Sequence, residues 1–382
     1  MIHHHHVHYH IPRLKEMVRV YWCHAFGAFA ISLAAIFVPI FLVKNGISIN
    51  QVLAFCILQY SFAALLQYPS IRLIQFIRPH RVIAIGTIIV ALFFYLLSTL
   101  PLTTPNLILL AFVWALQHSI YWGTFHYIFG IARGHEHTSQ KVAGLDALVI
   151  ALTTIAPAIG GIIATAFGIG YTYTFTIVLL ILAVIPMLSR HKGPSKSKMR
   201  TSFHQIKQMR RDIFANFCVG TAQATESVMW PLFIFFIITS YAGIGILSSV
   251  IAVSSVVVTL FVGAHTEAKG GKPYINHGIV VYILTSLSRA GVQNIGQIFG
   301  LNLLAGVGRS LFHTPYFSRY YANSDGPGRL GYIFAMETFL CFGVITQLSL
   351  VLILSLFIGA ETALAIGLSL VAITFVGVKF IR

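Results

Sequence analysis

Charged residues are scarce in this sequence. Asp, Glu, Lys and Arg make up 9% of its 382 residues, whereas an average soluble domain has about 25%. A surface that faces water cannot be built from so few charges, so a soluble globular protein is excluded. The chain is instead 57% hydrophobic, and many separate apolar runs reach the roughly 20 residues that cross a bilayer as a helix. The sequence therefore predicts an all-α polytopic membrane protein embedded in a lipid bilayer.

Acidic residues are rarer still. There are nine Asp and Glu against 25 Lys and Arg, which gives a formal net charge of +16. In a soluble protein this excess would suggest a nucleic-acid partner. In a membrane protein the cations lie in loops, where they orient the chain and meet anionic lipid. We therefore expect no nucleic-acid partner.

The sequence also has few cysteines and lacks the common enzyme signatures. It has no phosphate-binding loop, no G-x-S-x-G and no zinc-type spacing of His and Cys, so we expect neither an enzyme nor a cofactor. The start of the chain, MIHHHHVHYH, is either an expression tag or a native metal-binding tail. The cysteines all lie in apolar runs and are expected to pack as small hydrophobes: Cys23, Cys56, Cys218 and Cys341.

One long polar run divides the chain. It is the basic segment 190–211, and it contains no acidic residue. We interpret it as a cytoplasmic linker between two six-helix bundles, residues 1–189 and 212–382, with residues 1–19 as a cytoplasmic His-rich tail. The expected membrane helices number twelve: 20–43, 49–68, 82–100, 106–131, 141–167, 170–189, 212–239, 243–263, 274–290, 297–320, 328–357 and 361–379.

The distribution of loop cations supports this topology. With twelve spans and a cytoplasmic N-terminus, nearly all Lys and Arg outside the spans fall on the cytoplasmic side. The outer loops hold only Lys44 and Arg289. One mistaken span would invert every later loop and destroy the pattern. Both termini are therefore predicted to face the cytoplasm of a plasma or inner membrane.

The two halves resemble repeats of each other. A shift of about 191 residues lays the fourth expected helix on the tenth without gaps, and it aligns polar groups as well as apolar ones. The prolines of the first and seventh expected helices also correspond, but their spacing differs from this shift by one residue. The matched pairs are Ser119 and Ser310, His118 and Arg309, Asp146 and Glu337, and Pro39 and Pro231.

Two six-helix halves, a basic linker and cytoplasmic termini resemble the major facilitator superfamily. Residues 263–272, GAHTEAKGGK, are similar to its G-x-x-x-D-x-x-G-[RK]-[RK] loop, with Glu267 in place of Asp. The resemblance implies that this loop helps to control closure of the cytoplasmic side. The counterpart in the first half, 68–81, lacks the acid and the glycines.

A second motif lies in the fifth expected helix. Residues 156–161, APAIGG, resemble the family's G-P-x-x-G-G motif, which is common in proton-coupled exporters, with Ala156 for the first glycine. The resemblance favours efflux slightly over uptake. The characteristic arginine of the exporters' fourth helix is absent, and His118 stands in that region. A proline kink with small residues for close helix packing explains the motif equally well.

Two ionisable residues fall in the middle of expected helices. Arg309 is about halfway along the tenth helix and Glu226 about halfway along the seventh. Each costs about 2.5–3.5 kcal/mol at mid-membrane, so each needs a partner or water. The family resemblance implies that both helices line the central cavity. Arg309 is then a site for an anionic group of the substrate, with Glu226 as its competing partner or a proton carrier. The alternative is a structural ion pair between the two.

Other polar positions extend these hypotheses. His118 and Trp122 share an aromatic face, as do His313 and Tyr316, and such faces suit either a cavity wall that stacks on a substrate ring or plain packing. Asp146 and Glu337 either carry protons or, as we prefer, lock a gate by pairing with loop bases such as Arg133 or Lys141.

The sequence thus predicts a secondary active transporter that moves a small organic solute by alternating access, coupled to H⁺. As is usual in the family, a monomer is expected. One alternative is a divalent transition-metal transporter of the same fold. The other is a non-transporting membrane receptor or assembly factor. Candidate ligands for the metal alternative are His24, His118, His126, His313 and Cys218.

Overall fold

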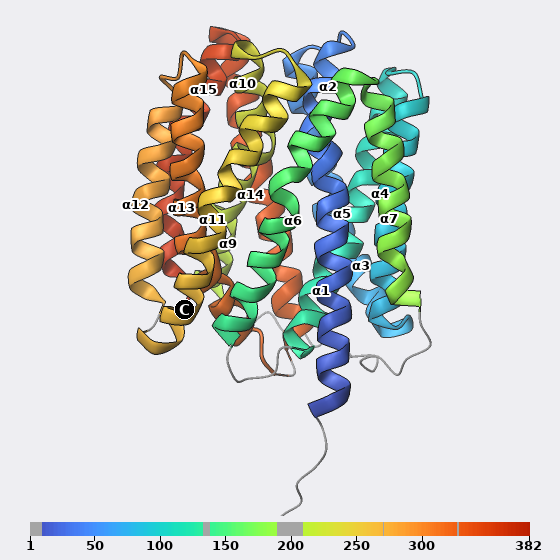
Figure 1. Cartoon of the computed structure of the whole chain (residues 1–382), viewed down its shortest axis with the longest axis vertical. Helices are drawn as coiled ribbons and strands as arrows, with labels where there is room; N and C mark the ends of the chain where they lie inside the picture. Colours follow the sequence, from blue (N-terminus) through green and yellow to red (C-terminus); the bar gives the residue numbers. More distant parts are fainter. Residues whose placement is uncertain (1–9, 133–137, 189–208, 270, 327) are drawn as a thin grey trace, which may run out of the picture.

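The fold consists of helices. The computed structural model describes residues 10–132, 138–188, 209–269, 271–326 and 328–382, and it contains no strand within them. The helices stand side by side in one bundle (Figure 1). Their bounds are α1 His10–Ala34, η1 Ala35–Phe37, α2 Val38–Lys44, α3 Ile49–Phe76, α4 Pro79–Thr99, α5 Thr104–Ala132, α6 Thr138–Ala166, α7 Ile169–Leu188, α9 Arg210–Ala224, η2 Thr225–Met229, α10 Trp230–Ile237, α11 Tyr241–Lys269, α12 Lys272–Arg289, α13 Ile295–Asn323, α14 Arg329–Ile358, α15 Ala360–Phe375 and η3 Val376–Phe380.

The bundle has the outer surface of a multi-pass membrane protein. Within the described ranges, nine helical segments are long and apolar enough to cross a bilayer. Large apolar side chains cover the outside, as at Phe357, Leu65 and Ile373, which are 80%, 74% and 72% exposed. The remaining expected spans, 212–239, 243–263 and 274–290, are helical but do not meet the same criterion. The all-α membrane fold is confirmed, and the number of twelve spans stays a prediction.

Several helices extend past the predicted ends. The second expected helix stops at Tyr68 because a proline follows, yet α3 continues through Pro69 to Phe76. Membrane helices tolerate an internal proline when neighbouring groups satisfy the freed carbonyl. The first helix begins at His10 instead of residue 20. These predictions were wrong because polar and proline residues end helices less often in this environment than in water.

The helix bounds repeat along the chain. Both ends of α5 (104–132) recur in α13 (295–323) at a spacing of 191 residues. A tertiary hydrogen bond repeats with them. Ser119 Oγ donates to the carbonyl of Ala63 at 3.0 Å, and Ser310 Oγ donates to that of Ser255 at 3.1 Å. The repeat predicted from the sequence is therefore present in the packing of the two halves.

The first helix of each half is interrupted at the equivalent place. A 3₁₀ turn, η1, follows α1, and a π turn, η2, follows α9. Pro39 and Pro231 lie just beyond these turns. Proline has no N–H, so the carbonyl four residues earlier loses its helical partner and the winding changes locally. Glu226 lies inside the π turn.

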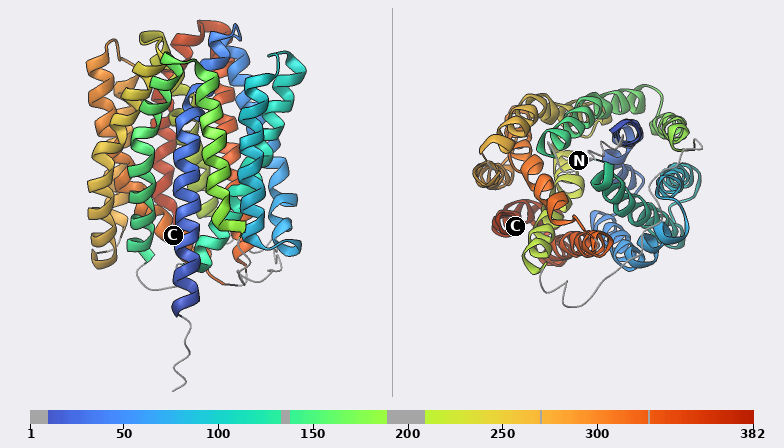
Figure 2. Two further views of the ribbon diagram at one scale, coloured as in Figure 1. Left: turned by 45° about the vertical axis from the view of Figure 1, so that its right-hand side comes forward. Right: turned by 90° about the horizontal axis from the view of Figure 1, so that it is seen from below.

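The two halves of the chain occupy opposite sides of the bundle. Helices from the first half and from the second lie on different sides when seen along their axes (Figure 2). The start of α1 and the C-terminus lie at the same end (Figure 1). We call this the linker end, because α7 ends there and α9 begins there, and we call the other the far end.

Close contact between the halves occurs where α6 packs on α11 and where α3 packs on α14. Glycines allow the first contact. A methyl group on Gly161 would lie 2.4 Å from the carbonyl oxygen of Tyr241, and one on Gly245 would lie 2.1 Å from that of Pro157. The backbone N–H of Ala158 donates to Ser249 Oγ at 3.1 Å. The APAIGG motif is thus a packing surface between the halves.

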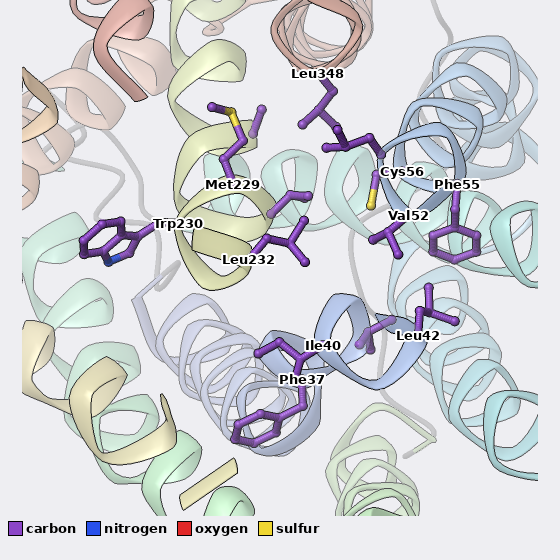
Figure 3. Close-up of a cluster of buried hydrophobic side chains, with 14 of the residues drawn as sticks. Phe37, Ile40, Leu42, Val52, Phe55, Cys56, Met229, Trp230, Leu232 and Leu348 are labelled. Atoms are coloured by element: carbon purple, nitrogen blue, oxygen red, sulfur yellow. The ribbon is translucent and has the colours of Figure 1, made fainter. Parts of the chain in front are cut away.

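A hydrophobic cluster contains side chains from both halves toward the far end. Figure 3 shows members of it that come from η1, α2, α3, η2, α10 and α14. All four cysteines are free and buried, and Cys56 lies in this cluster. The labelled members are Phe37, Ile40, Leu42, Val52, Phe55, Cys56, Met229, Trp230, Leu232 and Leu348.

Candidate functional site

Two hydrogen bonds fix how α13 lies against the segment α9–η2–α10. Near the linker end, the Tyr316 hydroxyl donates to Asn216 Oδ1 at 2.8 Å. Toward the far end, Trp230 Nε1 donates to Asn302 Oδ1 at 3.0 Å. The segments run in opposite directions, and the two bonds are fourteen residues apart on each (216 to 230 and 302 to 316). A point midway between them, about 10 Å from either, is level with residue 223 on one segment and 309 on the other.

Gln223 and Arg309 occupy that middle level, and both are exposed. Residues seven or eleven positions apart share one face of a helix. Asn302, Tyr316 and Tyr320 therefore lie on the face of Arg309, and all three are fully buried. Among the residues that the structure describes, Arg309 has no hydrogen-bond or ion-pair partner. An unpaired guanidinium thus lies near the centre of the membrane span.

Glu226 already has a partner. Arg289 donates from Nη1 to Glu226 Oε1 at 2.5 Å and from Nη2 to Oε2 at 3.2 Å. The Arg289 side chain is fully buried and that of Glu226 is 33% exposed. The guanidinium also stacks over the Trp230 ring at 4.5 Å. A bidentate pair of this kind neutralises both charges.

Arg289 was predicted to lie in an outer loop, and this was wrong. It is the last residue of α12, which packs along α13, and its side chain is directed into the protein. The structural ion pair considered between Glu226 and Arg309 is likewise formed by Arg289 in place of Arg309.

Polar groups of other helices reach the same level. The His118 ring lies edge-on to Tyr60, with centroids 5.4 Å apart, and His118 Nε2 is 3.9 Å from Cys341 Sγ. The Tyr60 hydroxyl is within reach of Gln223 and Ser227. Tyr60, His118 and Cys341 lie near the middle of their helices, and Gln223 lies near the middle of the segment α9–η2–α10. We call Tyr60, His118, Gln223, Arg309 and Cys341 the central polar layer.

The other predicted substrate residues are placed differently. Trp122 lies one turn from His118 and stacks on His126 at 5.9 Å. Tyr316 is fully buried, and its hydroxyl is occupied by Asn216. His313 packs against Phe317 at 4.5 Å. Tyr316 therefore belongs to the packing between helices, whereas His118 and Arg309 share the central polar layer.

A second polar cluster lies nearer the linker end. His126 Nε2 is 3.4 Å from Glu337 Oε1, and His126 Nδ1 is 2.8 Å from the Tyr321 hydroxyl. Tyr320 donates to Glu337 at 3.4 Å. Glu337 thus pairs with a histidine of the other half. Of the groups suggested for a gate, Arg133 lies outside the described residues, and so do the side chains of Lys141, Asp146 and Glu267.

The residues suggested as metal ligands do not gather. In the described part of the chain, no group of three or more His, Cys, Asp or Glu could hold a metal ion. His24 binds the Tyr121 hydroxyl through Nδ1 at 2.9 Å and stacks on Phe125. Cys218 is buried against α15 and η3, beside Gly377. His118, His126 and His313 are engaged as described above.

Comparison with known proteins identifies the fold. No protein-family model matches this chain, and no curated protein matches its sequence. Among solved structures it is similar to the human organic anion transporter MFSD10 (TETRAN), with a TM-score of 0.69 and 11% identity over 96% of this chain and 99% of that one. It is also similar to the nucleoside transporter NupG, with a TM-score of 0.66 and 15% identity over 97% and 98%. The chain thus shares the fold of these two transporters, and this agrees with the fold that the resemblance to the major facilitator superfamily implied.

Proposed function

We propose that this protein is a secondary transporter of small organic anions, and that it works by alternating access between its two halves, residues 1–189 and 212–382. The observation that carries the proposal is the unpaired guanidinium of Arg309 at mid-membrane. The similar solved structures include an organic anion transporter and a nucleoside transporter, which supports a small organic substrate.

Charge balance favours an anion. Glu226, the acid nearest this level along α9 and η2, is neutralised by Arg289. Around Arg309 the central polar layer offers neutral groups: the hydroxyl of Tyr60, the amide of Gln223 and the imidazole of His118. The layer therefore has a net positive charge. A carboxylate or phosphate on the substrate would balance it, and the neutral groups would bind the substrate's polar edges.

The other parts of the proposal rest on the sequence. Twelve spans place the linker and both termini on the cytoplasmic side. The APAIGG segment favours efflux, and buried titratable groups such as Glu337 favour H⁺ as the coupling ion. We propose a monomer that carries out no chemical reaction on its substrate.

The test is a thermal-shift screen followed by flux in liposomes. The probes are aromatic and aliphatic carboxylates, each paired with its neutral methyl ester. We expect carboxylates but not esters to raise the Tm, because a ligand that binds the folded state stabilises it. In Arg309→Gln the apparent Kd should weaken at least about tenfold, since a charge-assisted hydrogen bond contributes roughly 1.5–3 kcal/mol.

Arg210→Gln is the matched control. Arg210 is exposed at the start of α9 at the linker end, and its replacement removes the same charge away from the layer. It should leave the carboxylate response unchanged. Equal stabilisation by acid and ester, or binding retained in Arg309→Gln, would contradict the anion site. Binding without flux of the same compound would favour a receptor over a transporter.

A further inference from the structure

At the linker end, the halves are joined through His126 and Glu337. His126 belongs to α5 in the first half, and Glu337 belongs to α14 in the second. Their side chains are 7% and 4% exposed. The remaining contacts between the halves here include Phe129 against Tyr321 and Tyr68 against Phe334. A titratable pair is therefore embedded in an otherwise aromatic contact, and separating the halves at this end would break it.

The pair has few charged neighbours. In the part of the chain that the structure describes, no lysine or arginine lies within ion-pair distance of Glu337. The charged group on this side is Asp212 of α9, which contacts Tyr332 and is paired with Arg382. The other titratable groups that face the pair are neutral at pH 7 in their unperturbed state, and are His24, His118, Cys218, His313, Tyr316, Tyr320, Tyr321, Tyr332 and Cys341.

An isolated buried carboxylate or imidazolium is costly, so the closed contact is favourable only when the pair is neutral overall. Neutrality requires one dissociable proton between Glu337 and His126 Nε2. It can be held as imidazolium with carboxylate or as imidazole with carboxylic acid. In either form the Nδ1–H of His126 donates to the oxygen of Tyr321, at the observed 2.8 Å.

Opening this end changes the proton count. In water at pH 7, a free glutamate is ionised and a free histidine is mostly neutral, so the separated pair holds no such proton. We propose that His126 and Glu337 form a one-proton binding site that exists only while the two halves are closed at the linker end. Closure takes up one proton and opening releases it, which gives the proposed transporter its coupling step.

The pH dependence follows from this count. Since the closed state holds one proton more than the open state, closure weakens as pH rises. The ratio of closed to open molecules should fall about tenfold per pH unit above roughly pH 6.5, where a free histidine loses its proton. Between about pH 4.3 and 6.5 the open state also holds one proton, on its histidine, so the ratio should be flat.

The experiment measures closure directly, without substrate. Spin labels are placed on Phe76→Cys and Asn276→Cys of the full chain in liposomes, and their distance distribution is recorded from pH 5 to 9. Both positions are exposed at the linker end, one in each half, and the native cysteines are buried. We expect the tenfold slope in the parent protein. Its loss is expected in Glu337→Gln. In His126→Gln the buried Glu337 must hold the proton alone, so the slope should persist and extend down to about pH 4.3, where free glutamate takes up its own proton.

Asp325→Asn is the control, because Asp325 pairs with Arg329 inside one half, also toward the linker end. It should keep the slope, as should Arg309→Gln. Failure of anion binding would leave this result intact, so the two proposals can fail separately. No slope in the parent, a slope retained in Glu337→Gln, or a slope lost in Asp325→Asn would overturn the proposal. If Glu337→Gln does not fold, His126→Gln decides, because a slope that still ends near pH 6.5 there would show that His126 takes no part.

Discussion

The Glu226–Arg289 pair is a case in which one residue determines the chemistry of another. Glu226 lies in the π turn of the seventh expected helix, and Arg289 reaches it from the end of α12. The arginine is fully buried and stacked on Trp230, so Glu226 is the group that balances its charge. The pair fixes η2 against α12, whereas Arg309 has no such partner among the described residues.

Removal of either partner should be destabilising. We expect Glu226→Ala to lower the free energy of unfolding by about 3–5 kcal/mol, since it leaves the fully buried Arg289 uncompensated. Arg289→Ala should lower it by less, because the Glu226 side chain is 33% exposed. Unfolding of the purified protein in detergent measures this loss. The double variant Glu226→Gln/Arg289→Met should lose less than the sum of its single variants. Lys272→Ala, at the exposed start of the same helix, should have little effect. Strictly additive losses would contradict the pairing.

The sequence identified some residues of the candidate site and missed others. Arg309 and His118 were recognised because charge and imidazole are rare in apolar helices. Tyr60 was not, because an aromatic residue in an apolar run carries no such signal. Arg289 did carry a signal. It was one of two cations placed in the outer loops, which otherwise lack Lys and Arg. Its burial against Glu226 explains why it is an exception to this distribution.

Among the helices, the contact of α6 with α11 depends on glycine. The carbonyl of Pro157 lies where a side chain at position 245 would begin. Such close approach of two backbones is typical of membrane helix pairs, in which small residues replace the hydrophobic effect as the source of association.

Gly245→Ala should therefore force α6 and α11 apart. We expect a lower Tm and a longer distance between spin labels at the far ends of these two helices. Gly300→Ala is the matched control, because a methyl group there meets nothing within 4 Å and alanine favours a helix over glycine by about 1 kcal/mol. It should leave the Tm unchanged or raise it. Equal effects of the two substitutions would show that close packing is not the cause.

The positions of the helices were predictable, but their irregularities were not. Apolar runs place each expected span on a helical segment, since length and hydropathy are local properties. The breaks at η1 and η2 were not predicted, although Pro39 and Pro231 were seen to occupy similar settings. A proline frees a carbonyl wherever it occurs, and only the neighbouring helices decide whether the chain bends, unwinds or continues as it does at Pro69.

At the scale of the whole molecule, the two halves are built on one plan. The matching hydrogen bonds of Ser119 and Ser310 join equivalent helices in each half. Residue pairs that join the two halves could not be predicted in this way. His126 and Glu337 are distant in the chain and share no local pattern, so the sequence suggested loop bases for Glu337. Such pairs depend on how the two halves pack together, and local sequence patterns do not determine this.

The common plan predicts a loss of stability in both halves when this hydrogen bond is removed. Ser119→Ala should lower the free energy of unfolding by about 0.5–1.5 kcal/mol, the usual net value of a hydrogen bond. Ser310→Ala should lower it by more, because Ser310 Oγ also accepts from the buried Thr259 hydroxyl at 2.9 Å, and the double variant should show the sum of the two losses. Ser98→Ala is the comparison, since Ser98 is exposed and bonds only to Tyr95 in its own helix. A loss at one serine alone would mean that the halves are not equivalent in this bond.

The alignment of His118 with Arg309 has a consequence for how a transporter of this kind would bind its substrate. If the two halves were identical, both would bind a substrate equally. Here the second half has the permanent charge of Arg309 at the position where the first half has the imidazole of His118. The two halves would therefore contribute unequally to binding. A bound anion would stay in contact with the second half throughout the cycle, and movement of the first half would close and then open access to it.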